Sequence, residues 1–206
     1  MTLVRTGSTP EEYLAMERQA TQKSEYVNGR IYAMTGASRA HNRVVLNLAA
    51  ALHGQLRGGP CEAYVSDMRV KVSETGLYTY PDVVVACGEP RFEDAHVDTL
   101  IDPTAIIEVL SDSTEGYDRG AKFAHYRRLA SLQEYVLIAQ DTVRVERYVR
   151  EGERWVLTEI AGSAEALTLT SVGCTIPLRD IYERVELPTP DGRAPLPAER
   201  LSGDRG

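Results

Sequence analysis

Two near-continuous apolar runs occupy the middle of the chain, and each contains one acidic residue. Residues 81–86 include Asp82 near their start, and residues 105–110 include Glu108 in their interior. Apolar runs of this length, without strict alternation, are typical of strands that are covered on both faces of a sheet. The pattern therefore predicts two central strands, each carrying one carboxylate.

Helical periodicity and capping residues predict three helices. The first follows Thr9, where Pro10 and Glu12 complete a capping box with proline in the first turn. A second helix is predicted to begin near Ser38, and a third to cover residues 118–132. The second has apolar residues at helical spacing, namely Val44, Val45, Leu48, Leu52 and Leu56.

Shorter β-prone segments predict the remaining strands. Asn28-Gly29 lies between residues 25–27 and 30–34, which is the strongest local signal for a hairpin. Residues 88–103 indicate a surface loop. Further strands are expected at residues 61–65, 68–72, 134–139, 143–149, 154–160 and 174–176, with a helical turn at 178–182. The elements together predict an α/β or α+β domain with a mixed sheet.

The length and composition are those of a globular protein. The chain has 206 residues, of which 43% are hydrophobic. Residues 1–187 are predicted to form one domain, and the proline-rich residues 188–206 a disordered tail. No apolar segment reaches the ~18 residues of a membrane span. The first seven residues contain no apolar signal region, so we expect a cytoplasmic protein without membrane association.

Charge and cysteine content narrow the candidate functions. The net charge of −7 argues against nonspecific coating of nucleic acid, which depends on neutralising phosphates. It leaves room for a nucleic-acid enzyme, because a carboxylate cluster that holds metal is itself acidic. The three widely separated cysteines form no CxxC pair, and they predict neither a zinc site nor a disulfide framework.

The acids inside the apolar runs are the candidate chemical groups. Aspartate and glutamate are almost never fully buried unless they are paired. If the two predicted strands are adjacent, Asp82 and Glu108 converge at one edge of the sheet, where Mg²⁺ takes one or two carboxylates and water. The alternative is structural: Asp82 is then a turn residue after Pro81, and Glu108 pairs with an arginine.

Several short motifs extend this pattern in one order along residues 9–185. Pro81-Asp82 followed by Glu108-Val109-Leu110 resembles the PD-(D/E)xK nuclease signature, and the ordered set resembles the Uma-two family of restriction-endonuclease-like proteins. The other matching pieces are Thr9-Pro10-Glu11-Glu12-Tyr13, Glu25-Tyr26-Val27-Asn28-Gly29-Arg30-Ile31, Ser66-Asp67-Met68-Arg69-Val70, Asp118-Arg119-Gly120-Ala121-Lys122, Tyr126 and Glu134-Tyr135-Val136-Leu137.

The resemblance implies a restriction-endonuclease-like fold, a mixed β-sheet flanked by helices. It also implies a Mg²⁺- or Mn²⁺-dependent endonuclease that hydrolyses phosphodiester bonds, with DNA as the expected partner. Asp82, Glu108 and the carbonyl of Val109 would bind the metal, and Glu25 would be an accessory acid. From the residues alone, Glu25 is equally a solvated strand residue. Paired cuts across a duplex would favour a homodimer. The rival interpretation is a catalytically inactive nuclease-like module that binds nucleic acid or a protein.

One position departs from the signature. Lysine is expected two residues after the glutamate, where this chain has Leu110. Glu108 and Leu110 would share one strand face. Lys122 can supply the missing cation, because it shares a helical stripe with Tyr126 and Leu129 that would face the sheet. The alternative is that Lys122 extends past the core into solvent.

Other charged residues are weaker candidates. His41 could touch the site, although a surface or capping role is the simpler interpretation. Asp67, Arg69 and Lys71 alternate along one strand, where they line either a groove or a solvated face. Six arginines could contact phosphates, but the acids interleaved with them, including Asp118 and Glu146, make ordinary surface pairing the simpler interpretation. These arginines are Arg119, Arg127, Arg128, Arg144, Arg147 and Arg150.

Overall fold

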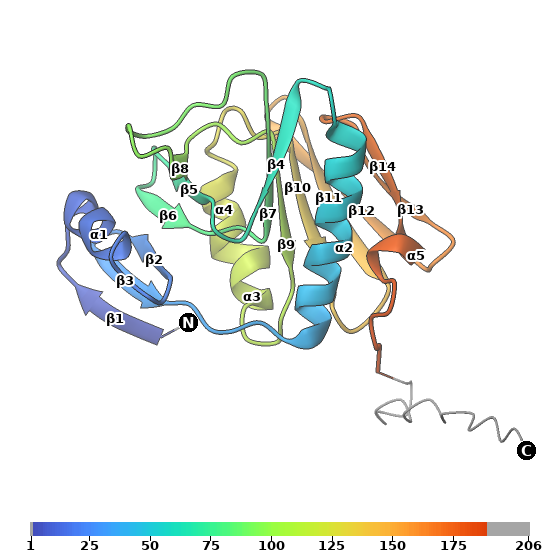
Figure 1. The fold of residues 1–206 in the computed structure, drawn as a ribbon, viewed down its shortest axis with the longest axis horizontal. Coiled ribbons are helices and arrows are strands. Elements are labelled where there is room, and N and C mark those ends of the chain that lie inside the picture. Colours follow the sequence, from blue (N-terminus) through green and yellow to red (C-terminus); the bar gives the residue numbers. More distant parts are fainter. Residues whose placement is uncertain (1, 189–206) are drawn as a thin grey trace, which may run out of the picture.

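A six-stranded mixed sheet forms the centre of the fold (Figure 1), in a computed structural model that describes residues 2–188. Its strand order is β12-β11-β10-β9-β7-β4. Strands β9 and β10 are parallel, and the other neighbours are antiparallel. The bounds are β4 (Cys61–Val65), β7 (Val83–Cys87), β9 (Ala105–Val109), β10 (Glu134–Ile138), β11 (Arg144–Glu151) and β12 (Arg154–Ala161). The two apolar runs are therefore adjacent strands, as the site prediction required.

Residues of β7 and β9 contribute alternately to apolar cores on the two faces of this sheet. One core lies beneath α2 (Arg39–Leu56), α5 (Leu178–Ile181) and the hairpin of β13 (Ala166–Leu169) and β14 (Cys174–Pro177). It includes Val44, Leu48, Val83, Val85, Ile107 and Val136. The opposite core includes Val84, Ile106, Leu110, Phe123, Tyr126 and Tyr135. Burial on both faces explains why these strands lack polar alternation.

The opposite core is covered by one helical segment of mixed geometry. It consists of α3 (Glu115–Tyr117), the π-helical turn η1 (Asp118–Lys122) and α4 (Phe123–Tyr126). The predicted helix over residues 118–132 therefore begins earlier and ends earlier than expected. Leu129 is still buried beyond the end of the helix. A π turn depends on tertiary contacts more than on local periodicity, and such turns are frequent at functional sites.

A second six-stranded sheet has the order β1-β3-β2-β6-β5-β8. It confirms the predicted hairpin, because Asn28 and Gly29 have φ values of 49° and 80°, as a type I′ turn requires. The predicted capping box of Thr9 and Glu12 is present at α1 (Pro10–Glu17). The strand bounds are β1 (Thr2–Thr6), β2 (Ser24–Val27), β3 (Arg30–Ala33), β5 (Arg69–Val72), β6 (Leu77–Thr79) and β8 (Thr99–Leu100).

Some features differ from the prediction. The structure also contains β1, β6, β8 and β13, which the sequence pattern does not predict; β6 and β8 have only three and two residues. Cys61 and Cys87 form a disulfide between β4 and β7, which corrects the expectation of no disulfide. Apart from Pro188, the predicted tail lies outside the described residues. Within residues 2–188, no helix is both long and apolar enough to cross a bilayer.

The packing of α2 can be tested by two leucine substitutions on the same helix. Leu48 is fully buried against the central sheet, whereas the side chain of Leu46 is 59% exposed. Leu48→Ala should lower the free energy of unfolding by about 2–5 kcal/mol, because it removes apolar contacts and leaves a cavity. Leu46→Ala should change it by less than ~0.5 kcal/mol. Urea unfolding followed by circular dichroism measures both, and equal losses would contradict this assignment of the buried face.

Candidate active site

The register of the central sheet brings Asp82 and Glu108 together. Val83 of β7 is paired with Ile107 of β9, so Asp82 lies at the strand end closest to Glu108. The Val109 N–H donates a hydrogen bond to Asp82 Oδ2 at 2.7 Å. Glu108 belongs to the sheet face that the α3–α4 segment covers, because its neighbours Ile106 and Leu110 pack in that core. Both predicted carboxylates therefore lie side by side at the end of the sheet where β7 begins and β9 ends.

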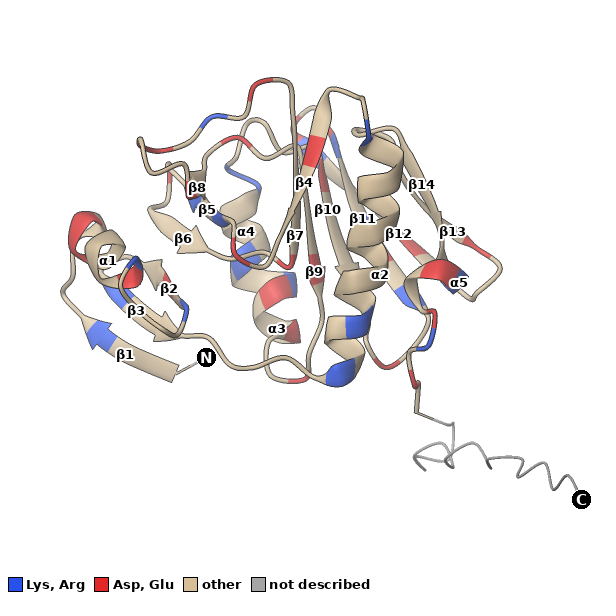
Figure 2. Cartoon of the chain, in the orientation of Figure 1, with Lys and Arg blue, Asp and Glu red and all other residues tan. Residues whose placement is uncertain are grey.

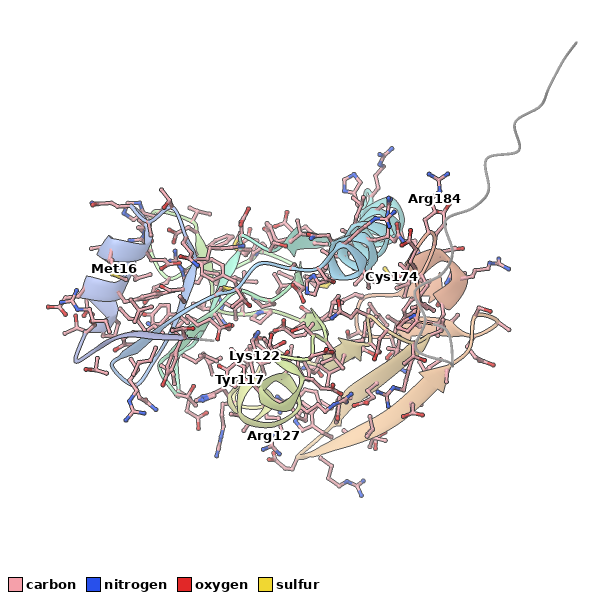
Figure 3. All side chains as sticks on the ribbon, turned by 90° about the horizontal axis from the view of Figure 1, so that it is seen from below. Met16, Tyr117, Lys122, Arg127, Cys174 and Arg184 are labelled. Atoms are coloured by element: carbon pink, nitrogen blue, oxygen red, sulfur yellow. A yellow bond between two sulfur atoms is a disulfide. The ribbon has the colours of Figure 1, made fainter. Side chains whose placement is uncertain are left out.

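Lys122 projects from η1 toward these acids. Its Nζ lies 2.8 Å from Glu108 Oε1, 3.4 Å from Glu25 Oε1 and 3.5 Å from Asp118 Oδ1. The side chain is only 5% exposed. Figure 3 shows Lys122 on the inner side of the helix, whereas Arg127 lies on the outer side. Lys122 therefore reaches the acids and does not extend past the core into solvent.

Glu25 and Asp118 complete the set of carboxylates around the ammonium. Glu25 is buried on β2, where it accepts hydrogen bonds from Thr79 Oγ1 and, at 3.2 Å, from Tyr117 Oη. The interpretation of Glu25 as a solvated strand residue is therefore wrong. Asp118 is only 3% exposed, so the expected surface pairing of this acid is also wrong. The π turn places it beside Lys122, a consequence that sequence spacing did not reveal.

Hydrogen-bonding and charge balance shape the protonation of this cluster. Burial raises the pKa of Glu108 to about 8, although Lys122 opposes the shift, and nearby acids add to it. Burial likewise raises the pKa of Asp118. The surrounding carboxylates raise the pKa of Lys122 well above its usual value despite burial. Tyr126 Oη donates to Glu108 Oε1 at 2.9 Å. The cluster thus holds one charged lysine among more acids than it can neutralise.

The acids and Lys122 line a pocket of about 590 Å³. Acidic residues of β9 and of the α3–η1 segment mark this end of the sheet in Figure 2. The walls come from the segment before α2 and from the polar loop after β9, both of which carry hydroxyl groups, at Thr35, Ser38, Ser111, Ser113 and Thr114. The volume lies within the range of ligand-binding pockets.

His41 also belongs to the site, contrary to the expectation of a surface or capping role. Its Nε2 lies 3.1 Å from Asp82 Oδ2, and its side chain is 14% exposed. His41 shares one face of α2 with Val44 and Leu48, which pack against the sheet. That shared stripe is the sequence signal that could have identified His41 as a residue facing the site.

The weaker basic candidates have partners elsewhere. Arg69 is buried and donates to Tyr80 and Thr99, and Lys71 pairs with Glu93, so this strand face is neither a groove nor fully solvated. Four of these six arginines form ion pairs with acids, but Glu134 and Glu146 are buried and do not lie at the surface as expected. The pairs are Arg119 with Glu115 and Glu146, Arg128 with Glu74, Arg144 with Glu159 and Arg147 with Glu134.

Within residues 2–188, no group of three or more His, Cys, Asp or Glu side chains is arranged to hold a metal ion. A cation in this pocket would therefore take few protein ligands.

Comparisons with known proteins place the fold and the family. The chain superposes with a TM-score of 0.71 on a crystal structure from Anabaena variabilis described as "a putative nuclease belonging to DUF820". The match covers 85% of this chain and 97% of the other at 17% identity, and it shows a shared fold.

Relatives in Synechocystis sp. are more similar in sequence. The uncharacterized protein sll1609 is 45% identical over 155 residues, which are 75% of this chain and 88% of the relative. The uncharacterized protein slr1290 is 37% identical over 175 residues, 84% of this chain and 90% of the relative. The family model Uma2, described as "Putative restriction endonuclease", matches residues 10–179. The chain therefore belongs to the Uma2 family.

Proposed function

We propose that this protein is a Mg²⁺- or Mn²⁺-dependent endonuclease that hydrolyses phosphodiester bonds in DNA. The observation that carries the proposal is the contact of Lys122 with Glu108 beside Asp82, at the base of the pocket. Asp82, Glu108 and Lys122 supply the two acids and the cation of the PD-(D/E)xK signature, although Leu110 occupies the usual lysine position. Family membership and the shared fold support the same reaction class.

The residues of the pocket fit a hydrated divalent ion. Hydrogen bonds to Asp82 fall on Oδ2, and those to Glu108 fall on Oε1, so each carboxylate keeps one oxygen without a hydrogen-bond partner among the described residues. With the carbonyl of Val109, these oxygens form a hard donor set. Mg²⁺ usually retains several waters and takes one or two carboxylates. Burial raises the pKa of Glu108 in the metal-free protein, and a bound cation would favour its ionised form.

The chain's own residues have distinct parts in the proposed reaction. A bound ion would supply Lewis-acid chemistry to the phosphodiester and its attacking water. The Lys122 ammonium, held charged by its carboxylate neighbours, would orient that water or stabilise negative charge developing on the phosphate. Glu25 keeps Lys122 in place through their 3.4 Å contact. Two such sites, related by the two-fold axis of a homodimer, would allow paired cuts across a duplex.

One observation favours the rival function, a nuclease-like module that binds nucleic acid or protein without cleavage. The described residues offer no group of three or more His, Cys, Asp or Glu side chains that could hold a metal ion. An inactive site of this kind need not bind divalent ions. Isothermal titration calorimetry with Mg²⁺ and Mn²⁺ separates the two functions, since the proposed endonuclease must bind one of them.

Substitution of the two carboxylates tests the proposed function directly. Asp82→Asn or Glu108→Gln should abolish cleavage that depends on Mg²⁺ or Mn²⁺, because each removes one charged ligand. The assay compares single- and double-stranded DNA and RNA with each metal and with chelator. Circular dichroism checks that the variants remain folded. Cleavage at the parental rate by both variants, at saturating Mg²⁺, would show that the site is assigned wrongly.

The proposed role of Lys122 can be tested with a neutral side chain of similar length. Lys122→Met keeps most of the aliphatic stem but removes the charge that faces Glu108. The cleavage rate should fall at least ~100-fold, comparable to removing one preorganised donor. Arg127→Met, on the exposed outer side of the same helical segment, is the matched control and should cleave normally. Parental cleavage by Lys122→Met would place the catalytic cation elsewhere.

The burial of Glu108 also predicts how pH affects the metal-free protein. Because the pKa of Glu108 is about 8 in the folded state and near its ordinary value when unfolded, the folded state holds the extra proton between these pH values. The contribution of the Glu108 carboxyl to the free energy of unfolding is fully present at low pH and is lost as pH rises through about 8. The parent should therefore lose stability relative to Glu108→Gln between pH 5 and about 8. Urea unfolding in chelator measures this difference, which should be constant if Glu108 is ionised throughout.

A further inference from the structure

The imidazole of His41 contacts the carboxylate of Asp82 beside the proposed metal site. We propose that His41 is a positioning residue, which donates a hydrogen bond from Nε2 to Asp82 Oδ2 and thereby orients the other carboxylate oxygen for a divalent cation. The inference rests on the proposed function, because it assigns Asp82 as a ligand. Its basis is the 3.1 Å contact between two largely buried side chains from separate elements.

The direction of this hydrogen bond follows from the acceptor. An ionised carboxylate can only accept, so His41 Nε2 must carry the hydrogen. Val109 N–H donates to the same oxygen from β9 at 2.7 Å. Two donors on Oδ2, one from a helix and one from a strand, restrict rotation of the Asp82 carboxylate. Asp82 lines the pocket, and its Oδ1 has no hydrogen-bond partner among the described residues.

His41 is itself held firmly by the first turn of α2. Its backbone N–H donates to Ser38 Oγ at 3.0 Å, and that hydroxyl donates in turn to Gln140 beyond the end of β10. Val44 and Leu48, on the same face of the helix, are fully buried against the sheet. The backbone of Asp82 is also anchored, since its carbonyl accepts from Ser66 N–H at 3.0 Å. The backbones on both sides of this contact are therefore held by hydrogen bonds.

A purely structural role for His41 predicts a different dependence on side-chain chemistry. If the ring only fills space between α2 and β7, an apolar side chain of similar size should replace it. If it donates to Asp82, a side chain with an N–H at similar reach should replace it, and an apolar one should not. Outer hydrogen bonds to metal ligands are typically worth about 10- to 100-fold in metal affinity. Metal affinity, measured without substrate, therefore distinguishes the two roles.

The experiment is calorimetric titration of Mn²⁺ and Mg²⁺ into the full chain and its variants. His41→Leu should weaken binding at least ~10-fold, whereas His41→Gln, which retains an N–H donor, should keep most of the affinity. His53→Leu is the matched control, because His53 is exposed on the same helix, and it should bind like the parent. Asp82→Asn provides the reference for loss of a ligand. If His41→Leu does not fold by circular dichroism, His41→Met takes its place.

The outcomes separate this inference from the proposed function. Weak binding by His41→Leu with rescue by His41→Gln supports the positioning role. Parental affinity in His41→Leu, together with loss in Asp82→Asn, overturns the inference and leaves the metal site intact. Equal loss in His41→Leu and His41→Gln also overturns it, because the N–H donor then has no effect. If the parent binds neither ion, the proposed function and the inference both fail.

Discussion

The buried ammonium of Lys122 is the group on which the candidate site depends. Its three carboxylate neighbours come from different parts of the fold: Glu108 from the central sheet, Glu25 from the second sheet and Asp118 from the π turn. Burying such charges is costly unless each is paired, and removing one partner of a buried pair is strongly destabilising. The lysine therefore joins three elements, and the carboxylates around it outnumber its single positive charge.

The central sheet makes this arrangement possible because it is covered on both faces. Strand β9 contributes Ile107 to one core and Ile106 to the other, so a carboxylate in its interior is largely shielded from solvent. Glu108 has polar partners only because the α3–α4 segment brings Lys122 and Tyr126 over it. An apolar residue at position 108 would pack more simply. The acid in a core strand is thus a local conflict with folding, and such conflicts are characteristic of functional sites.

The opposite face of the sheet contributes through α2. This helix packs its apolar stripe against β7 and β9, and its first turn then places His41 against Asp82. Asp82 and Glu108 are consequently supported from different sides, one by α2 and the other by the helical segment that carries Lys122. The similarity to the Anabaena variabilis structure extends over most of the fold. The proposed chemistry rests on these particular side-chain contacts.

The sequence by itself determined the features that have a local cause. Apolar runs identified β7 and β9 with their acids, a capping box located α1, Asn28-Gly29 located a hairpin, and the stripe containing Lys122 predicted its inward direction. Only the tertiary structure decided the contact of His41 with Asp82, the burial of Asp118 and the pairing of Cys61 with Cys87. Each of these depends on segments that are distant in sequence, or on a π turn stabilised by packing, and no local periodicity encodes such contacts.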